Sequence, residues 1–191
     1  RTVVDTAGTR LAVTAANGAE LINSGAAGDP GLYYPSMARA IGLTVGWRVK
    51  PVSGSVSAMF GWDTNAAGQP RDGVLFVTGS LRAYFVSNSR DILSGVYTDG
   101  VTYDCLTILR NPGVWILIRG GAFTTWSLGF VSVSDTVAML PAMAATQAVT
   151  QLIYARRVYA AQLNQWASQY ANATERKAVS VDNDTITADV A

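Results

Sequence analysis

The sequence predicts an all-β fold in which two antiparallel sheets pack as a sandwich, and three observations carry this prediction. The charged residues are almost all Asp and Arg, with only two Glu and two Lys, so the common surface residues of helices are scarce. The 18 Gly residues suit tight turns, and the many Thr, Ser and Val residues suit strands. Turn signals recur about every 8 to 12 residues between short apolar segments, which is the spacing of sandwich strands.

Length and charge limit the class of protein. The 191 residues suffice for one domain with a sizeable core, and 49% apolar against 14% charged residues excludes disorder driven by charge. The net charge is +1 and no run of Lys and Arg exceeds two residues, so we expect no nucleic-acid partner. No apolar stretch reaches the roughly 20 residues of a membrane helix, so we expect no membrane insertion. Because the sequence begins with Arg1 instead of Met, we expect a piece of a longer product.

The first third of the chain predicts a succession of strands. Three short ones, separated by turn dipeptides, are expected over residues 2–5, 10–15 and 20–23. The clearest signal covers residues 41–50, where apolar residues alternate with Gly, Thr, Arg and Lys, as in a long half-buried strand. The same alternation over 56–62 follows a turn at 51–54. We therefore expect these two strands to pair as an antiparallel hairpin.

Further hairpins are predicted in the middle of the chain. Gly79-Ser80 is a two-residue connection typical of hairpins, and Asn111-Pro112-Gly113 marks a second turn. Residues 141–147 are predicted as a loop at the sheet edge. The strands expected around these features cover residues 74–78, 81–87, 103–109, 114–119 and 125–133.

Residues 148–170 fit two patterns. Leu152, Arg156 and Tyr159 begin a series at helical spacing, while residues 149–159 also fit an extended strand. We favour a strand to Tyr159, then a short helical or irregular segment, and a terminal strand near 184–190. No repeat of the length of a propeller blade is present, which favours a sandwich over a propeller.

One segment carries a resemblance to a known family. Residues 103–128, YDCLTILRNPGVWILIRGGAFTTWSL, combine a Tyr-led apolar strand ending in Leu-Arg, a Gly turn, a return strand ending in Gly-Gly, and an aromatic segment with Trp. This run resembles the central hairpin of concanavalin A-like lectin/glucanase domains of the laminin-G-like kind. The resemblance covers about residues 36–159 and implies a jelly roll of two curved antiparallel sheets. We expect residues 1–35 to add N-terminal strands and loops, and residues 160–191 to form an extension with a possible short helix and a terminal strand.

The chain lacks the side chains that most catalysis requires. It has no His, and therefore no Ser-His or Cys-His arrangement. Glycoside hydrolases on the fold that the resemblance implies carry paired acidic residues on one strand, whereas Glu20 and Glu175 stand near opposite ends of this chain. We predict that the protein is not an enzyme and assign no catalytic residue. Cys105 lies inside an apolar run and is expected to be a small buried hydrophobe.

No metal-binding residues are assigned either. Residues 63–68 resemble the first half of a calcium loop, but Ala67 replaces the third ligand and Val74 stands where a bidentate Glu belongs. A turn that closes a hairpin is the favoured interpretation. The resemblance leaves calcium open elsewhere, on Asp99, Asp104 or Asp135 with loop carbonyls, although no spacing demonstrates such a site.

The candidate contact residues are aromatic and basic. Trp115 falls in the phase opposite to Val114, Ile116 and Ile118, together with Leu117 and Arg119, so this face can look out of the sandwich. A covering loop or a partner subunit is favoured over an open glycan-stacking platform, because both phases of the strand are apolar. Weaker candidates for the same contact role are Tyr33, Tyr34 and Tyr84.

These observations favour a module that works through its surface. Domains of the kind that the resemblance implies occur in large secreted, cell-surface and virion proteins, where they bind glycans or pack against one another. The leading hypothesis is a non-catalytic structural or adhesion module of a larger extracellular or virion protein, acting by self-assembly or surface attachment. Expected partners are further copies in a homo-oligomer or larger assembly, or a glycan. The alternatives are an isolated carbohydrate-binding lectin domain and, less favoured, a glycan-cleaving enzyme.

Overall fold

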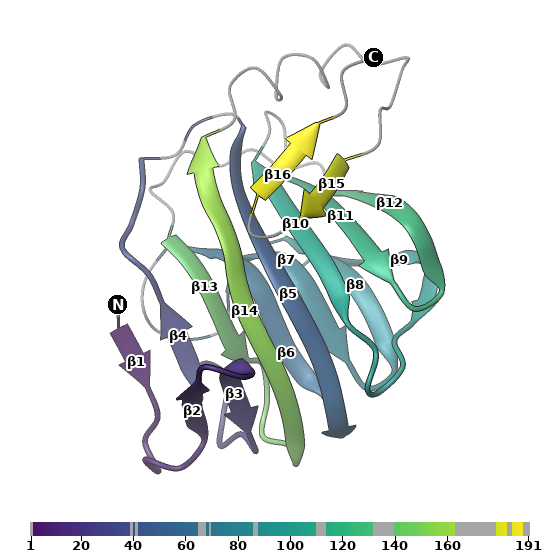
Figure 1. Ribbon diagram of the computed structural model, residues 1–191. Coiled ribbons are helices and arrows are strands. Elements are labelled where there is room, and N and C mark those ends of the chain that lie inside the picture. Colours follow the sequence, from purple (N-terminus) through teal and green to yellow (C-terminus); the bar gives the residue numbers. More distant parts are fainter. Residues whose placement is uncertain are drawn as a thin grey trace.

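The computed structural model describes the chain as two seven-stranded antiparallel sheets packed face to face (Figure 1). The residues described are 2–38, 40, 42–64, 68, 70–85, 88–109, 114–131, 140–162, 179–182 and 185–188. Within these ranges the secondary structure is all β, with no helix. This part of the chain therefore has no helix that is long and apolar enough to span a bilayer. The predicted all-β antiparallel sandwich is confirmed.

The back sheet, which lies behind in Figure 1, has the strand order β1-β4-β13-β6-β7-β8-β9. All of its neighbouring strands are antiparallel. Its strands are β1 Thr2–Val4, β4 Gly31–Tyr33, β13 Leu140–Ala145, β6 Ser57–Asp63, β7 Asp72–Val77, β8 Ser80–Phe85 and β9 Asn88–Val96.

The front sheet lies over the back sheet in Figure 1 and has the strand order β12-β11-β10-β5-β14-β3-β2. The early and late parts of the chain thus contribute to both sheets. Its strands are β12 Phe123–Val131, β11 Val114–Gly120, β10 Tyr103–Leu109, β5 Leu43–Gly54, β14 Gln151–Gln162, β3 Gly18–Ile22 and β2 Leu11–Thr14. A separate hairpin of β15 Val179–Asp182 and β16 Thr185–Ala188 lies near β14.

Two predicted hairpins are present. β7 and β8 pair as far as Val77 and Ser80, and the connecting Thr78 and Gly79 both have positive φ, 32° and 80°, as the tight turns of β-hairpins require. β10 and β11 also pair antiparallel. Their predicted turn at Asn111-Pro112-Gly113 lies outside the described residues.

The predicted pairing of strands 41–50 and 56–62 is wrong. β5 pairs with β10 and β14, whereas β6 pairs with β13 and β7, so the two strands belong to opposite sheets. Their apolar phases meet across the sandwich, where Trp47 and Phe60 lie 6.0 Å apart between ring centroids. Alternation marks the phase of each strand that faces the core, although every residue of β6 is buried, and the same pattern arises whether two strands lie side by side or face to face.

The prediction of a loop over 141–147 is also wrong, since β13 lies inside the back sheet between β4 and β6. Every residue of β13 is buried. Met143 joins the main core, while Ala142 and Ala144 pack with Tyr33 in a second cluster. A strand covered on both faces shows no alternation of polar and apolar residues, so its sequence lacks the expected signal.

The end of the chain agrees in part with the prediction. β14 is a strand through Gln162, which settles residues 151–159 in favour of the extended pattern. The helical or irregular segment predicted from residue 160 is wrong for residues 160–162, which continue β14, and its remainder over 163–178 lies outside the described residues. β16, Thr185–Ala188, matches the predicted terminal strand, and β15 is an additional strand.

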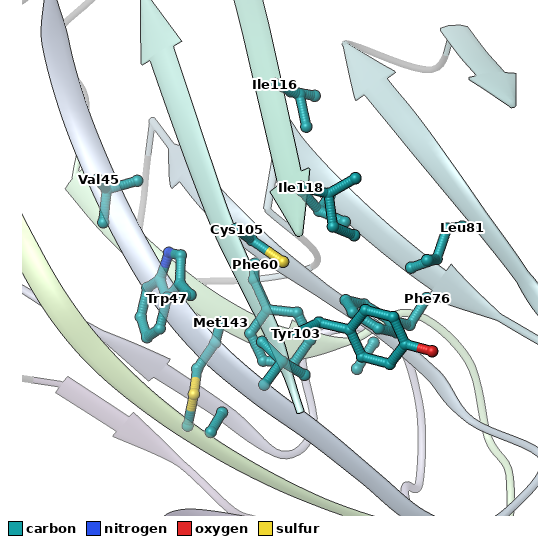
Figure 2. Close-up of a cluster of buried hydrophobic side chains, with 14 of the residues drawn as sticks. Val45, Trp47, Phe60, Phe76, Leu81, Tyr103, Cys105, Ile116, Ile118 and Met143 are labelled. Atoms are coloured by element: carbon teal, nitrogen blue, oxygen red, sulfur yellow. The ribbon is translucent and has the colours of Figure 1, made fainter. Parts of the chain in front are cut away.

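The core consists of aromatic rings that meet between the sheets (Figure 2). The ring centroid of Phe60 lies 6.0 Å from that of Trp47 and 5.7 Å from that of Phe76. The ring centroids of Phe76 and Tyr103 are also 5.7 Å apart. The indole of Trp62, on β6 of the back sheet, donates a hydrogen bond of 3.1 Å to the carbonyl of Thr107, on β10 of the front sheet. Apolar burial and this cross-sheet bond hold the two layers in one register.

Shortening a core aromatic tests this packing. Phe60→Ala should lower the free energy of unfolding by about 3–5 kcal/mol, because Phe60 is fully buried and the surrounding rings cannot collapse into the cavity. Urea denaturation measures the change. Val13→Ala is the control, since Val13 is 54% exposed on β2 and should change stability by less than about 0.5 kcal/mol. Similar losses in the two variants would contradict the assigned core.

Candidate functional site

The outer face of the front sheet, which is the face turned away from the back sheet, carries the candidate site. On β5, Trp47 and Val49 point into the core. Because side chains alternate along a strand, Arg48 and Lys50 lie on the outer face. Residues directly opposite in neighbouring strands share a face. Arg48 is opposite Asp104 on one side and Arg156 on the other, so this register assembles polar side chains from three strands.

An ionic network crosses the centre of this face. Asp104 on β10 accepts from Arg48 Nε at 2.8 Å through Oδ1, and from Arg119 Nη2 at 2.9 Å through Oδ2. The Asp104 side chain is 13% exposed, whereas the two arginines are 42% and 35% exposed. The Arg119 guanidinium also lies over the Trp126 ring, 5.0 Å from its centroid. The charged side chains are therefore held in fixed positions while their outer atoms remain in contact with water. We call Arg48, Asp104 and Arg119 the charged row.

Next to the charged row the same face becomes apolar. Leu117 pairs with Leu106, and Trp115 pairs with Ile108. Leu106 and Ile108 are buried, at 1% and 6% exposure, and Trp115 and Leu117 are half-buried. The structure thus places Trp115, Leu117 and Arg119 in one phase, opposite to the core residues of β11. It does not present Trp115 as a fully open platform.

On the other side of the charged row lies a half-open pocket of about 230 Å³. Arg48 forms the boundary shared by the charged row and the pocket. The residues that line the pocket come from the β2–β3 turn, β5, the segment before β10, and β14: Ala16, Asn17, Arg48, Lys50, Thr102, Tyr154 and Arg156. We call this the basic pocket.

Sequence reasoning missed Lys50, Tyr154 and Arg156 as candidate site residues. Lys50 was visible as a polar position in the alternating strand 41–50. Tyr154 and Arg156 flank the buried Ala155, and the extended pattern over 149–159 places them on one face. What the sequence does not contain is the pairing of β5 with β14, which brings Tyr154 opposite Lys50.

The three tyrosine candidates lie elsewhere. Tyr33 is 1% exposed in the back sheet, its hydroxyl donates to the Gly68 carbonyl, and burial together with nearby Asp63 and Asp29 raises its pKa. Tyr34 is half-buried, edge-on to Trp47 and stacked under the Arg157 guanidinium at 3.8 Å. Tyr84 is half-buried on β8. None of them joins Trp115 and Arg119, because β8 and β4 belong to the back sheet.

The acidic residues considered for calcium are dispersed. Asp63 accepts from the Thr64 amide at 2.7 Å through Oδ1, and residues 65–67 of that loop lie outside the described part of the chain. Asp104 holds two arginines, Asp99 is exposed on the loop before β10, and Asp135 lies outside the described residues. No group of three or more Cys, Asp or Glu side chains that could hold a metal forms among the residues with described positions.

Cys105 is buried in the core, as the sequence predicts. Burial, with a smaller effect of the adjacent Asp104, raises the pKa of its thiol well above the ordinary value. The thiolate, which is the reactive form, is therefore disfavoured.

A second depression, of about 480 Å³, lies beside Asp29 at the N-terminal end of the chain. Asp29 accepts from the Thr6 amide at 3.2 Å, from the Thr6 hydroxyl, and from Arg10 at 2.6 Å. Its side chain is 10% exposed and its carboxylate is fully engaged in tying the β1–β2 connection to the turn before β4. The contacts assign Asp29 a structural role.

Comparison with known proteins supports the fold and goes no further. No model of a protein family matches the chain, and no curated protein matches its sequence. The exoplasmic/lumenal domain of VIP36, solved in a Ca²⁺- and mannose-bound form, superposes with a TM-score of 0.55 at 10% identity, over 95% of this chain and 87% of that one. The SPRY domain of human HERC1 aligns with a TM-score of 0.49 at 12% identity, over 77% of this chain and 92% of that one. The likeness to the VIP36 domain shows that the chain has the fold of that domain, a jelly-roll sandwich of two antiparallel sheets.

The ionisation of Asp29 should set part of the acid stability. Burial alone would raise its pKa, but the Thr6 hydrogen bonds and the Arg10 charge outweigh burial and hold the pKa below its ordinary value of 3.8. A carboxyl whose pKa is lower in the folded state stabilises the fold above the unfolded pKa and loses this effect as the pH falls through the folded pKa.

Asp29→Asn should therefore lower the free energy of unfolding at pH 7 by about 1 kcal/mol. The difference from the wild type should shrink as the pH falls below 3.8. Urea unfolding between pH 7 and pH 2.5 measures the difference in free energy of unfolding between variant and wild type. Asp99→Asn, at an exposed carboxylate, is the control. A difference that stays constant with pH would contradict the proposed role of the charge.

Proposed function

We propose that this chain is a non-catalytic adhesion module of a larger extracellular or virion protein, of the laminin-G-like kind that residues 103–128 resemble. It attaches to a glycan through the outer face of the front sheet. The single observation that carries the proposal is the charged row, in which Asp104 holds Arg48 and Arg119 on the solvent-facing side of a rigid sheet.

The charged row contributes little to the stability of the fold. Ion pairs between partly exposed side chains are worth about 0–1 kcal/mol, and the core already fixes the register of β5, β10 and β11. An array of two guanidinium groups held by one carboxylate offers positioned donors to a ligand at a reduced ordering cost. Such an array suits the hydroxyl groups of a sugar.

Two aromatic side chains stand beside these polar groups. The Trp126 ring lies under Arg119, and Tyr154 lines the basic pocket next to Arg48. Sugars bind where an aromatic ring packs on their apolar face and polar side chains take their hydroxyls. The similarity in fold to a mannose-bound lectin domain is consistent with this use, although the low identity transfers the fold alone.

The positions of the carboxylates on this face support a non-catalytic role. Glycosidases place two carboxyl groups between about 5 and 9.5 Å apart. Asp104 on β10 and Glu20 on β3 are separated by β5 and β14, which at roughly 4.8 Å per strand spacing puts them about 14 Å apart. Both carboxylate oxygens of Asp104 are also already engaged as acceptors from two arginines.

Self-assembly is the second candidate, and the apolar end of the outer face favours it. Trp115 and Leu117 are half-buried beside the buried Leu106 and Ile108. A second copy that covered these side chains would bury apolar surface now in contact with water. Concentration-dependent mass in solution that Leu117→Arg abolishes would support this role.

Removing Asp104 tests the adhesion proposal. Asp104→Ala leaves Arg48 and Arg119 without their common partner, so glycan binding should weaken at least tenfold while the melting temperature changes little. Asp99→Ala removes an exposed carboxylate outside the charged row and should bind like the wild type. Binding is measured on a glycan array with and without EDTA, then by calorimetry with the strongest ligand. An unchanged affinity in Asp104→Ala, or product release from the glycans, would contradict the proposal.

A further inference from the structure

We propose that the basic pocket is an anion subsite, so that the glycan this module binds is an acidic one whose carboxylate or sulfate group enters the pocket. This inference rests on the proposed function and adds the chemical class of the ligand. It stands on the charges that line the pocket, on how Arg156 is held, and on the size of the pocket.

The lining of the basic pocket has an unbalanced charge. It contains Arg48, Lys50 and Arg156 and no carboxylate. Asp104 offsets part of the Arg48 charge but shares its own charge with Arg119. Lys50 has no ion pair and no hydrogen bond through its side chain within the part of the chain that the structure describes. Three cations around one half-open pocket repel one another and favour an anion between them.

The acidic side chain on the neighbouring strand β3 is hydrogen-bonded to side chains of the β2–β3 hairpin. Glu20 on β3 is opposite Tyr154 in the register. Its Oε1 accepts from Thr14 Oγ1 at 2.8 Å and from Asn17 Nδ2 at 2.9 Å, and Glu20 does not line the pocket. The lining therefore carries three cations and no carboxylate, and Asp104, Glu20 and the exposed Asp99 of the loop before β10 all lie outside it.

Arg156 is positioned before any ligand arrives. Its Nη2 donates to the carbonyls of Ala15 and Ala16, at 3.0 and 3.2 Å. A guanidinium has five N–H donors, so these two bonds fix its plane and leave Nε and Nη1 for another acceptor. Nε–H and the Nη1 protons lie on different edges of the guanidinium, so a carboxylate or sulfate accepts a single charge-assisted bond from one of these nitrogens, and the side chain loses little further freedom on binding.

The remaining lining residues suit a sugar. Tyr154 lies between Lys50 and Glu20 across the sheet and offers an aromatic surface, while Thr102 and Asn17 offer short polar side chains. The volume of about 230 Å³ is below the roughly 300–1,000 Å³ of pockets for drug-sized ligands, so it fits one charged residue of a longer chain. The rest of an oligosaccharide would extend over the charged row.

The test compares matched acidic and neutral sugars on the full chain. The probes are trigalacturonate, its methyl ester, and a sulfated galactotriose without carboxylate, measured by calorimetry at low and high salt. Wild-type protein should bind one or both acidic probes at least tenfold more tightly than the ester, with affinity falling as salt rises. The probe that binds identifies carboxylate or sulfate as the group recognised.

Two charge-removing variants locate the site. Lys50→Gln and Arg156→Gln should each weaken binding of the acidic probe about tenfold and leave the methyl ester unaffected. Lys50→Arg keeps the charge and should retain most of the affinity. Circular dichroism and the melting temperature verify that each variant is folded.

Three results would overturn the inference. Equal affinity for the ester and the acid would remove the anion subsite while the proposed adhesion to glycan stands. Acidic binding that survives both Gln variants would place the anion elsewhere. If no glycan binds, or if an oligoglutamate peptide alone binds through Lys50 and Arg156, the proposed function fails as well.

Discussion

The contact of aromatic rings between the two sheets is the constraint on which the remaining structure depends. Trp47, Phe60 and Phe76 meet at 5.7–6.0 Å and are almost fully buried. Because side chains alternate along a strand, placing Trp47 inside commits Arg48 to the outside, and a slip of one residue would exchange the two faces. The outer face of the front sheet is therefore a consequence of core packing, because the register that places the core residues also fixes the backbone positions of its polar residues.

The position of Asp104 follows from the same register. β10 lies between β5 and β11, so Arg48 and Arg119 stand on either side of it, about 10 Å apart by the usual strand spacing. Without a carboxylate between them the two guanidinium groups would repel and spread into solvent. The two oxygens of Asp104 bind one guanidinium each, which converts two flexible side chains into parts of the sheet surface. The main effect of this arrangement is order rather than stability.

The sequence predicts strands well where one face meets water. Residues 41–50 alternate visibly, whereas both phases of β11 are apolar and its hairpin with β10 is predicted from the Asn111-Pro112-Gly113 turn signal. The shared phase of Trp115, Leu117 and Arg119 follows from the two-residue period of a strand. β13 was missed because both of its faces are covered, and the β5–β6 hairpin was wrong because alternation does not specify the partner strand. The basic pocket could not be predicted for the same reason. Lys50 and Arg156 meet only through the pairing of β5 with β14, which depends on the complete sheet order.

Self-assembly and glycan binding would use different ends of the outer face, which are separated along the strands. From Trp115 to Arg119 the chain rises about 14 Å, and from Arg48 to Lys50 about 7 Å more, at roughly 3.4 Å per residue. Trp115 and Lys50 are thus about 20 Å apart along the strands, whereas Leu117 lies only about 7 Å from the level of Arg48 and Arg156. A partner that covers Trp115 and Leu117 would leave Lys50 and Tyr154 accessible, because these lie beyond the charged row, and Arg156 lies on β14, three strands away from β11. Assembly through one end and ligand binding through the other are therefore compatible in a single sheet.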